Sequence, residues 1–439
     1  MKNVIGIRRE TKDPTQQRVP LSPEQVGLLV REHGLRVLVQ PMAKRIFPDE
    51  EYVAAGAELT EDLSAANIVF GVKEIDTRYM QPDMAYMFFS HTIKGQSYNM
   101  PMLRHMLDHG MTLFDYELIK NDEGQRLVFF GNFAGYAGMI DSMWAMGRRL
   151  EAEGYHTPLG SIEYATQYGM LSDAEAAFRE MGDRIRMEGL PEDLVPFVCG
   201  FTGYGNVSRG AQRLYDLLPS ETIAPQDLEN FFARGEFSNR VVYKVEFREQ
   251  DMFAPRETGA EFILQEFYDH PERYDAVFAQ YLPYLSMMIN GIYWEPRYPR
   301  LVRIEDARRL WKEQGRPRLR VIGDVTCDID GSVQLTVKET NALNPVFVYE
   351  PGSGTVRDGW EGEGPVILAV DKLPTELPRE ASSAFGSSLL PFVPLLASAD
   401  LARPFEDLDL PEALRHSIIA HRGALTPDFT YIAEHMSSQ

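Results

Sequence analysis

The stretch VCGFTGYGNVSRGAQ, residues 198–212, constrains the fold of this chain more than any other segment. Gly203 and Gly205 follow a short apolar run and precede a helical pattern, the strand–loop–helix context of a dinucleotide-binding loop. The first glycine allows a tight turn, and the second lets the backbone approach a pyrophosphate that the helix N-terminus stabilises. A glycine-rich turn without a ligand is the alternative. The predicted cofactor contacts are Gly203, Gly205, Asn206, Val207 and Ser208, the last standing where a third glycine is expected.

The residue that selects between NAD and NADP is expected about 20 positions beyond the loop, where an acid binds the ribose 2′-hydroxyl. We take ETIAP, residues 221–225, as the second strand of this unit. Ala224 stands where the acid belongs, and Asp227 follows late. The missing acid favours NADP, because an acid would repel its 2′-phosphate, although NAD stays open. Arg209 is either a partner of that phosphate or a solvated helix residue.

The chain in front of the loop alternates apolar runs with helical patterns. Residues 22–34 predict a helix with Ser22 as N-cap, Pro23 at its first position and Gly34 as its end. Apolar strands alternating with helices predict mostly parallel sheets covered on both faces. We therefore expect an α/β protein with two Rossmann-like domains and a cleft between them. The polar, irregular stretch 230–256 predicts loops or an insertion, and its part 238–256 fits no expected pattern.

Charge and composition exclude several classes of protein. The chain has 44 basic and 65 acidic residues among 439, a net charge of -21, which argues against binding to nucleic acid or to an anionic membrane. Its two cysteines predict no disulfide framework, and no Cys/His spacing predicts a metal site. Neither a signal peptide nor an apolar run of membrane-spanning length is evident, so we expect a cytoplasmic protein.

Cations near the predicted strand ends are candidates for the chemistry. Arg8, Arg9, Lys12 and Arg18 surround the end of the first strand in a strongly acidic protein, and an arginine there can bind a substrate carboxylate. Solvated surface cations are the alternative for some of them. Lys73 ends another apolar run, where open α/β sheets place ligands, unless it only pairs with Glu74.

Further polar residues follow other predicted strands. His91 ends the run AYMFFSH, and histidine transfers protons at physiological pH, although a lone histidine is more often structural. Glu117 ends TLFDYE, next to Asp115. Asp324 and Asp328 end a strand behind the glycine loop, where they could face the cofactor or form an acidic turn. Together these residues predict a dehydrogenase that acts on an amino or keto acid.

Longer motifs resemble one enzyme family. RRETK, FGVKE, FFSHTIKGQ, FGNFAGYAGM, FTGYGNVSRGAQ, INGIYWE and DKLPTELPREAS look like the lysine–2-oxoglutarate reductase domain of the bifunctional saccharopine-pathway enzyme. They resemble, more distantly, the lysine-forming saccharopine dehydrogenases and alanine dehydrogenase. The resemblance extends over essentially the whole chain, and we expect a monofunctional version of the enzyme.

The resemblance implies a reaction and a division of the chain. Lysine and 2-oxoglutarate would condense to saccharopine, or the reverse, with NADPH preferred over NADH. Residues 1–140 would begin a substrate domain, 141–330 would form the NAD(P)-binding domain, and 331–439 would return to the substrate domain. Lys73 and His91 match the family's acid–base pair, and Ser208 matches the family's loop. The predicted substrate-binding residues are Arg18, Lys12, Glu117, Arg126 and Asp328, and Asp324 is a further cofactor contact.

Two other functions stay open at this point. The same hydride chemistry could serve another amine, as in an opine-type condensation or an alanine dehydrogenase-like deamination. A non-catalytic binder of cofactor and amino acid could keep the fold, although a degenerate sensor would be expected to lose Lys73, His91 or Arg18. The sequence is compatible with a homo-oligomer but does not predict one.

Overall fold

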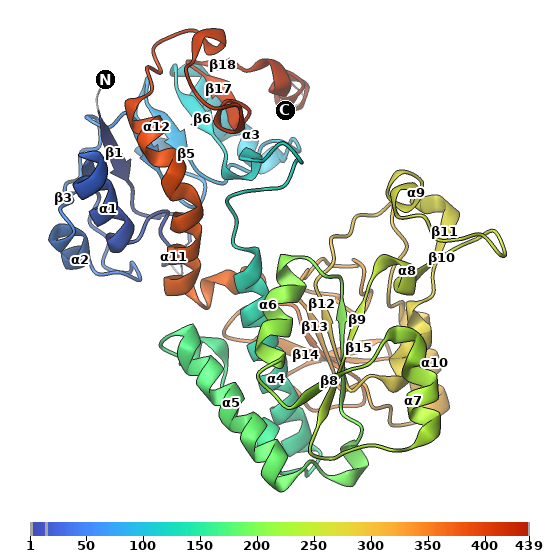
Figure 1. The fold of residues 1–439 in the computed structure, drawn as a ribbon. Coiled ribbons are helices and arrows are strands. Elements are labelled where there is room, and N and C mark those ends of the chain that lie inside the picture. Colours follow the sequence, from blue (N-terminus) through green and yellow to red (C-terminus); the bar gives the residue numbers. More distant parts are fainter. Residues whose placement is uncertain (1–2, 14–15, 438–439) are drawn as a thin grey trace. The chain divides into compact units, whose positions relative to one another are not determined.

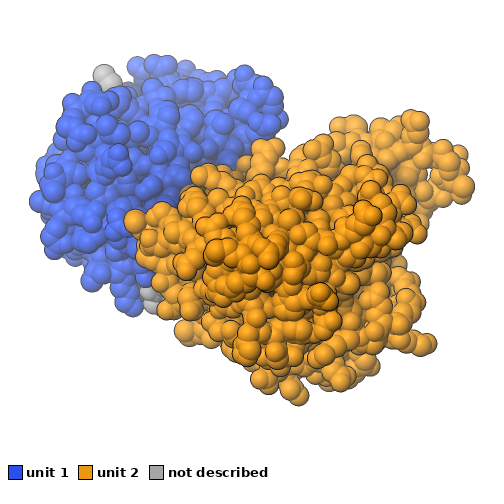
Figure 2. Space-filling model, turned by 60° about the horizontal axis from the view of Figure 1, so that its bottom comes forward, with its two compact units in different colours: residues 1–130, 378–439 blue, residues 131–377 orange. Residues whose placement is uncertain are grey.

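The structure, a computed structural model, describes residues 3–13 and 16–437 of the chain. It contains two compact units, drawn as a ribbon in Figure 1 and coloured separately in Figure 2. Unit 1 comprises residues 1–130 and 378–439, and unit 2 comprises residues 131–377.

These bounds correct the predicted division at 140/141 and 330/331. Unit 2 begins with the long helix α4 (Gly131–Ala152), which therefore belongs wholly to it. Unit 2 also continues past residue 330, because β14 (Val346–Glu350) and β16 (Val366–Leu368) extend its sheet. The chain returns to unit 1 at Pro378, where helix α11 (Pro378–Leu389) begins.

Unit 1 is built on an eight-stranded sheet in the order β18-β17-β6-β5-β4-β1-β2-β3. Strands β1 to β6 pair in parallel, whereas β17 pairs antiparallel with both β6 and β18. The order runs outward from β1 in both directions, so it reverses between β1 and β4. The other elements of unit 1 are β1 (Val4–Ile7), α1 (Pro23–His33), β2 (Arg36–Val39), α2 (Asp49–Ala54), β3 (Glu58–Leu59), β4 (Ile68–Phe70), β5 (Ala85–Met87), α3 (Met100–Asp108), β6 (Thr112–Phe114), α12 (Val393–Ser398), α13 (Glu412–Arg415), β17 (Ile418–His421), β18 (Ala424–Leu425) and α14 (Ile432–Ser437).

Local sequence signals explain the ends of α1, as predicted. Ser22 accepts a hydrogen bond from the backbone N–H of Gln25, and the Gln25 side chain accepts one from the backbone N–H of Ser22. This reciprocal capping box satisfies two donors that the first turn leaves unpaired. Gly34 ends the helix in the left-handed conformation, with φ 62°, which glycine adopts without steric cost.

The helical run at residues 378–398 is long and apolar enough to cross a membrane, by length and composition only. The sequence analysis did not expect such a segment. In the structure, Phe385, Leu389 and Val393 are fully buried in the core of unit 1, together with residues of β1 and β4. Packing against the sheet therefore accounts for the apolar composition of this run.

Unit 2 has a second eight-stranded sheet, in the order β15-β14-β16-β13-β12-β7-β9-β8, and a small two-stranded sheet of β10 and β11. Figure 1 shows α4, α5 and α6 on one face of the large sheet and α7 and α10 on the other. Its strand order reverses between β7 and β12. The elements not yet given are α5 (Leu171–Glu188), β7 (Val198–Thr202), α6 (Asn206–Tyr215), β8 (Ser220–Thr222), α7 (Leu228–Arg234), β9 (Val242–Phe247), α8 (Glu249–Met252), β10 (Phe253–Pro255), α9 (Leu264–Asp269), β11 (Tyr274–Ala276), β12 (Met287–Asn290), α10 (Ile304–Gln314), β13 (Val321–Asp324) and β15 (Thr355–Asp358).

The prediction of loops over residues 230–256 was wrong, because β9 lies inside the sheet between β7 and β8. Its apolar residues are buried, and its polar residues, Lys244 and Glu246, bond to residues on or next to α6. The Lys244 ammonium pairs with Asp216, and the Glu246 carboxylate accepts a hydrogen bond from the Gln212 amide at 3.0 Å. A strand inside the sheet can therefore carry polar residues, because their side chains find partners on or next to α6.

Helices α4 and α6 approach each other closely at two glycines. A Cβ atom added to Gly135 would lie 1.9 Å from the Val207 carbonyl oxygen, and one added to Gly210 would lie 2.3 Å from the Asn132 carbonyl oxygen. Real Cβ atoms do not approach backbone atoms so closely. Gly135 and Gly210 therefore allow the close packing of α4 against α6.

Candidate active site

The predicted catalytic residues Lys73 and His91, and the predicted substrate ligand Lys12, lie in loops after β4, β5 and β1. Lys12 lies in the loop after β1, and Lys73 and Glu74 follow β4, the neighbouring strand. His91 lies beyond the end of β5, the next strand of the sheet. In open α/β sheets, ligands bind outside the carboxyl ends of strands at the point where the order reverses. The fold therefore brings Lys12, Lys73 and His91 to the edge where a substrate site is expected.

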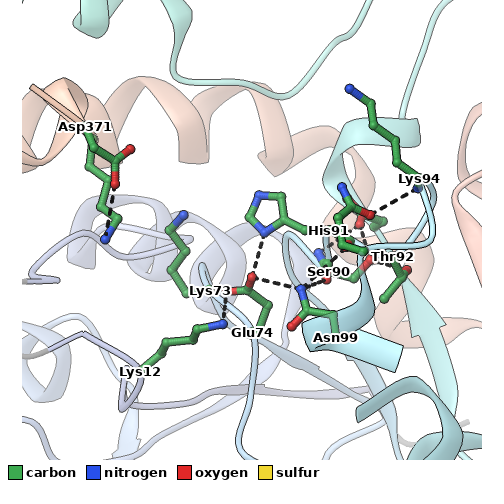
Figure 3. Close-up of polar contacts among 12 residues, drawn as sticks. Lys12, Lys73, Glu74, Ser90, His91, Thr92, Lys94, Asn99 and Asp371 are labelled. Carbon is green, nitrogen blue, oxygen red and sulfur yellow. Dashed lines mark hydrogen bonds and ion pairs between the residues drawn. The ribbon is translucent and has the colours of Figure 1, made fainter. Parts of the chain in front are cut away.

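The Glu74 carboxylate joins these loops (Figure 3). It lies 2.7 Å from His91 Nδ1, 3.2 Å from the Asn99 side-chain nitrogen and 3.3 Å from Lys12 Nζ. Burial raises the pKa of Glu74, but the hydrogen bonds from His91 and Asn99 and the charge of His91 outweigh it and lower the pKa to about 2. Glu74 is therefore ionised at neutral pH and accepts these hydrogen bonds.

The contact with Glu74 fixes the role of each nitrogen of His91. A carboxylate can only accept, so Nδ1 carries a hydrogen, and whenever the ring is neutral Nε2 is the acceptor. The backbone of His91 has φ 48°, a left-handed conformation that is uncommon outside glycine. Such backbone strain persists where the surroundings hold the residue, and it is found at functional sites.

A second buried carboxylate, that of Glu10, holds the Lys73 loop. It accepts hydrogen bonds from the backbone N–H of Val72 at 2.7 Å and from that of Lys73 at 3.0 Å. Burial raises the pKa of Glu10, and the neighbouring Arg8 opposes that shift. The position of Lys73 is thus set by its own backbone contact with the loop after β1.

The predicted carboxylate ligand Arg18 is 5% exposed, and its guanidinium contacts a row of aromatic rings that ends at His91. Its guanidinium carbon is 4.3 Å from the centre of the Phe130 ring, Phe130 lies against Phe89, and Phe89 stacks on His91 at 6.5 Å. The Nε atom of Arg18 donates to the side chain of Gln16 at 2.9 Å. Arg9, by contrast, pairs with Glu61 at the surface.

Glu117 and Arg126, both predicted to bind substrate, form an ion pair of 3.1 Å with each other. Asp115, which ends the same apolar run as Glu117, is fully buried and accepts hydrogen bonds from the backbone N–H of Ser90 and of Glu117, each at 2.8 Å. Burial raises the pKa of Asp115 to about 6, against the opposing effect of Ser90. Asp115 therefore fixes the loop that carries His91.

In unit 2 the glycine loop has the geometry that a dinucleotide requires. Gly203 has φ 79°, and a Cβ atom on Gly205 would meet nothing within 4 Å. Gly205 is the N-cap of α6 and no side chain caps the helix, so the backbone N–H groups of Asn206 and Val207 have no side-chain partner there. The residues present thus fit a pyrophosphate, with room beside Gly205 and a helix N-terminus facing it.

A cavity of about 280 Å³ adjoins this loop. It lies at the switch point of the second sheet, between the ends of β7 and β12. Its wall is largely aromatic, and Glu249 contributes a carboxylate to it. The lining residues are Gly203, Tyr204, Gly205, Glu249, Met252, Phe253, Phe267, Tyr268, Gly291, Ile292, Tyr293, Trp294 and Tyr298.

This cavity contains residues that the sequence analysis did not assign to a site. INGIYWE, residues 289–295, was noted only as a family motif, yet Gly291 to Trp294 line the cavity. Tyr204 was passed over between the two loop glycines. Glu249 was missed because the strand in front of it was not recognised, and the search for a ribose-binding acid was made behind β8, the edge strand.

The two predicted aspartates of unit 2 differ in environment. Asp324 is fully buried at the end of β13, and its carboxylate accepts hydrogen bonds from Asn290 at 2.8 Å, Thr326 at 2.6 Å and Thr336. Burial raises the pKa of Asp324, against these hydrogen bonds. Asp328 is exposed, and its carbonyl accepts from Gly331 in the turn that follows. Among residues 3–13 and 16–437, no three His, Cys, Asp or Glu side chains are arranged to hold a metal ion.

Known proteins resemble this chain in sequence. Residues 6–137 match the family model of the alanine dehydrogenase/PNT N-terminal domain. The α-aminoadipic semialdehyde synthase of Arabidopsis thaliana is 38% identical over 446 residues, which cover 98% of this chain and 41% of that protein. The NAD(+)-dependent, L-lysine-forming saccharopine dehydrogenase of Neurospora crassa is 26% identical over 401 residues, which cover 88% of this chain and 90% of the relative.

A solved L-alanine dehydrogenase superposes with a TM-score of 0.61 at 20% identity, covering 99% of both chains, so the predicted α/β class with two Rossmann-like domains is confirmed. The chain spans about two fifths of the Arabidopsis synthase. The resemblance inferred from the sequence motifs is likewise confirmed. The chain has the fold of L-alanine dehydrogenase and is similar in sequence, over 98% and 88% of its length, to the Arabidopsis α-aminoadipic semialdehyde synthase and the Neurospora lysine-forming saccharopine dehydrogenase.

Proposed function

We propose that the chain catalyses the NAD(P)H-dependent condensation of L-lysine with 2-oxoglutarate to saccharopine, or the reverse reaction. The observation that carries the proposal is the cluster of Lys73, Glu74 and His91 at the switch point of unit 1, in a chain whose unit 2 has a dinucleotide loop. The relationship to lysine-forming saccharopine dehydrogenases supports the choice of substrates.

The cofactor, when bound, supplies a hydride to the carbon of the imine formed by the two substrates. In this proposal Gly203 and Gly205 admit the pyrophosphate, and the backbone N–H groups of Asn206, Val207 and Ser208 donate to it. Asp324 acts from the buried end of β13 by holding the neighbouring loop. We propose NADPH as the preferred donor, with NADH as the alternative.

The side chains of unit 1 would move the protons. Condensation of an amine with a ketone requires a base for the amine and an acid for the departing water. With Nδ1 bonded to Glu74, the Nε2 atom of His91 can accept a proton and return it. Lys73, adjacent to Glu74 in the chain, is the second proton-transfer group.

The substrates carry several carboxylates, which require cations. Arg18, whose guanidinium lies over the Phe130 ring, is proposed to bind one of them. Lys12 lies 3.3 Å from Glu74 and would place a second positive charge at the same edge. Glu117, Arg126 and Asp328 complete the proposed substrate-binding set.

The test is oxidation of NADPH and of NADH by the purified chain with 2-oxoglutarate and a panel of amines, each assayed separately. Oxidation that requires lysine, with saccharopine as product, is the expected result. Oxidation with a different amine would assign the chain to another opine-type or alanine dehydrogenase-like reaction. Cofactor binding without oxidation of either nucleotide by any amine would refute the proposal and favour an amino-acid sensor.

A further inference from the structure

We propose that Arg248, held over the Tyr204 ring at the end of β9, binds the 2′-phosphate of NADPH and thereby selects NADPH over NADH. This inference rests on the proposed function, because it assumes that the glycine loop binds a nicotinamide dinucleotide. Ala224 follows the edge strand β8, which does not neighbour β7.

The position of the adenosine ribose depends on which strand lies beside the first strand of the sheet. In a dinucleotide-binding sheet, the ribose of the adenosine lies at the carboxyl end of the strand next to the first strand. That neighbour of β7 is β9, with Thr202 paired to Phe247 and the Gly203 backbone N–H donating to the Phe247 carbonyl at 2.9 Å. The edge strand β8, which ends near Ala224, is one position further away.

An uncharged residue and an arginine stand at the carboxyl end of β9. Phe247, the last residue of the strand, is fully buried and carries no charge, so no carboxylate stands at this position. Arg248 is the next residue. A sheet that binds NAD places an acid here, whereas an arginine nearby accommodates a 2′-phosphate.

The contacts of Arg248 place its guanidinium beside the glycine loop. Its guanidinium carbon lies 5.1 Å from the centre of the Tyr204 ring, and Tyr204 stands between the two loop glycines and lines the cavity. Its Nε atom is 3.2 Å from a Glu246 oxygen, and the side chain is 60% exposed. The guanidinium is thus placed beside the loop while remaining accessible to a ligand. Charge-assisted hydrogen bonds from arginine to phosphate are among the strong ones in proteins.

The acids around Arg248 oppose the binding of a phosphate. Glu246 pairs with the guanidinium, and Asp251 accepts a hydrogen bond from the Arg248 backbone N–H at 2.8 Å. Glu249 lines the cavity, where it would repel a 2′-phosphate but accept from a 2′-hydroxyl. Its carboxylate already accepts a hydrogen bond from the Tyr268 phenol at 2.9 Å, which holds it against the aromatic wall. Arg248 and Glu249 therefore have opposite effects on the choice of nucleotide.

The test measures binding in the absence of substrate. NADPH and NADH are titrated by fluorescence against the full chain, and 2′,5′-ADP and 5′-AMP are used as competitors. Arg248→Ala should weaken NADPH and 2′,5′-ADP by about 10- to 100-fold, the loss expected for one charge-assisted hydrogen-bonding group. NADH and 5′-AMP should change little. Glu249→Gln should change the two affinities in the opposite direction, strengthening the binding of NADPH and weakening that of NADH.

Two further variants control the experiment. Arg248→Lys keeps the charge but not the paired donors, and should fall between the parent and Arg248→Ala. Arg184→Ala removes a partly exposed arginine that pairs with Glu188 on α5, and should change no nucleotide affinity. Equal weakening of NADPH and NADH in Arg248→Ala would overturn the inference, as would a parent chain that binds 2′,5′-ADP no more tightly than 5′-AMP. Failure of the parent chain to bind either NADPH or NADH would instead overturn the proposed function.

Discussion

Substitution of Gly135 by alanine should destabilise unit 2, although alanine is the better helix former. The added methyl group would lie 1.9 Å from the Val207 carbonyl oxygen, and ordinary van der Waals contact begins at 3.4 Å. Helices α4 and α6 would have to separate by 3.4 − 1.9, or about 1.5 Å. Both atoms of the clash belong to or are fixed by backbone, so no rotation of a side chain can relieve it.

The steric cost of the added methyl group exceeds the gain in helix propensity. Overpacking of a well-packed core costs about 1–3 kcal/mol, and a shift of whole helices belongs at the upper end of that range. Replacement of a helical glycine by alanine returns about 1 kcal/mol. The net loss is therefore about 2 kcal/mol, which for a unit of this size lowers the midpoint of thermal unfolding by about 4–8 °C.

The matched variant is Gly205→Ala. A Cβ atom at Gly205 meets nothing within 4 Å, so thermal unfolding of the free protein should hardly change, whereas nucleotide binding should weaken because the methyl group occupies the approach of the pyrophosphate. Calorimetry of both variants, without and with nucleotide, separates the two effects. A Gly135→Ala chain as stable as the parent would refute the close approach of α4 and α6.

Three further results are expected from unit 1. Lys73→Met and His91→Gln should each lower kcat by roughly two to four orders of magnitude without loss of nucleotide binding, and near-normal turnover in both would remove them from proton transfer. Arg18→Ala should mainly raise KM for 2-oxoglutarate or saccharopine in steady-state assays; an unchanged KM would exclude Arg18 as a carboxylate ligand. Burial raises the pKa of Asp115 from 3.8 to about 6, so its contribution to stability is full below pH 3.8 and is lost as the pH rises through about 6, a change of up to about 3 kcal/mol. Asp115→Asn should remove that loss from urea unfolding measured between these pH values, and an identical pH profile in the variant would contradict the assignment.

The sequence predicted those features that depend on neighbouring residues. Ser22 as the N-cap of α1, Gly34 as its end and the polar residues after β4 and β5 all follow from short local patterns. The strand order does not, since β9 lies beside β7 through contacts that no local pattern encodes. For that reason the sequence analysis expected the ribose-binding acid after the edge strand β8 and not after β9.

The same distinction applies to the candidate site. Lys73 and His91 could be named because each follows an apolar run. Glu74 and Glu10 could not be assigned their roles, because their importance lies in the partners that the fold brings to them from other loops. A buried carboxylate that several donors share is visible only once those donors are in place.

The interruption of unit 1 by unit 2 has a consequence for synthesis of the chain. The core around β1 and β4 is completed by Phe385, Leu389 and Ile418, which are translated after the whole of unit 2. Unit 2 is continuous, and domains generally fold as units while the ribosome still elongates the chain. The nucleotide-binding unit can therefore fold first, while the strands that precede Lys73 and His91 still lack the part of their core that residues 378–439 supply.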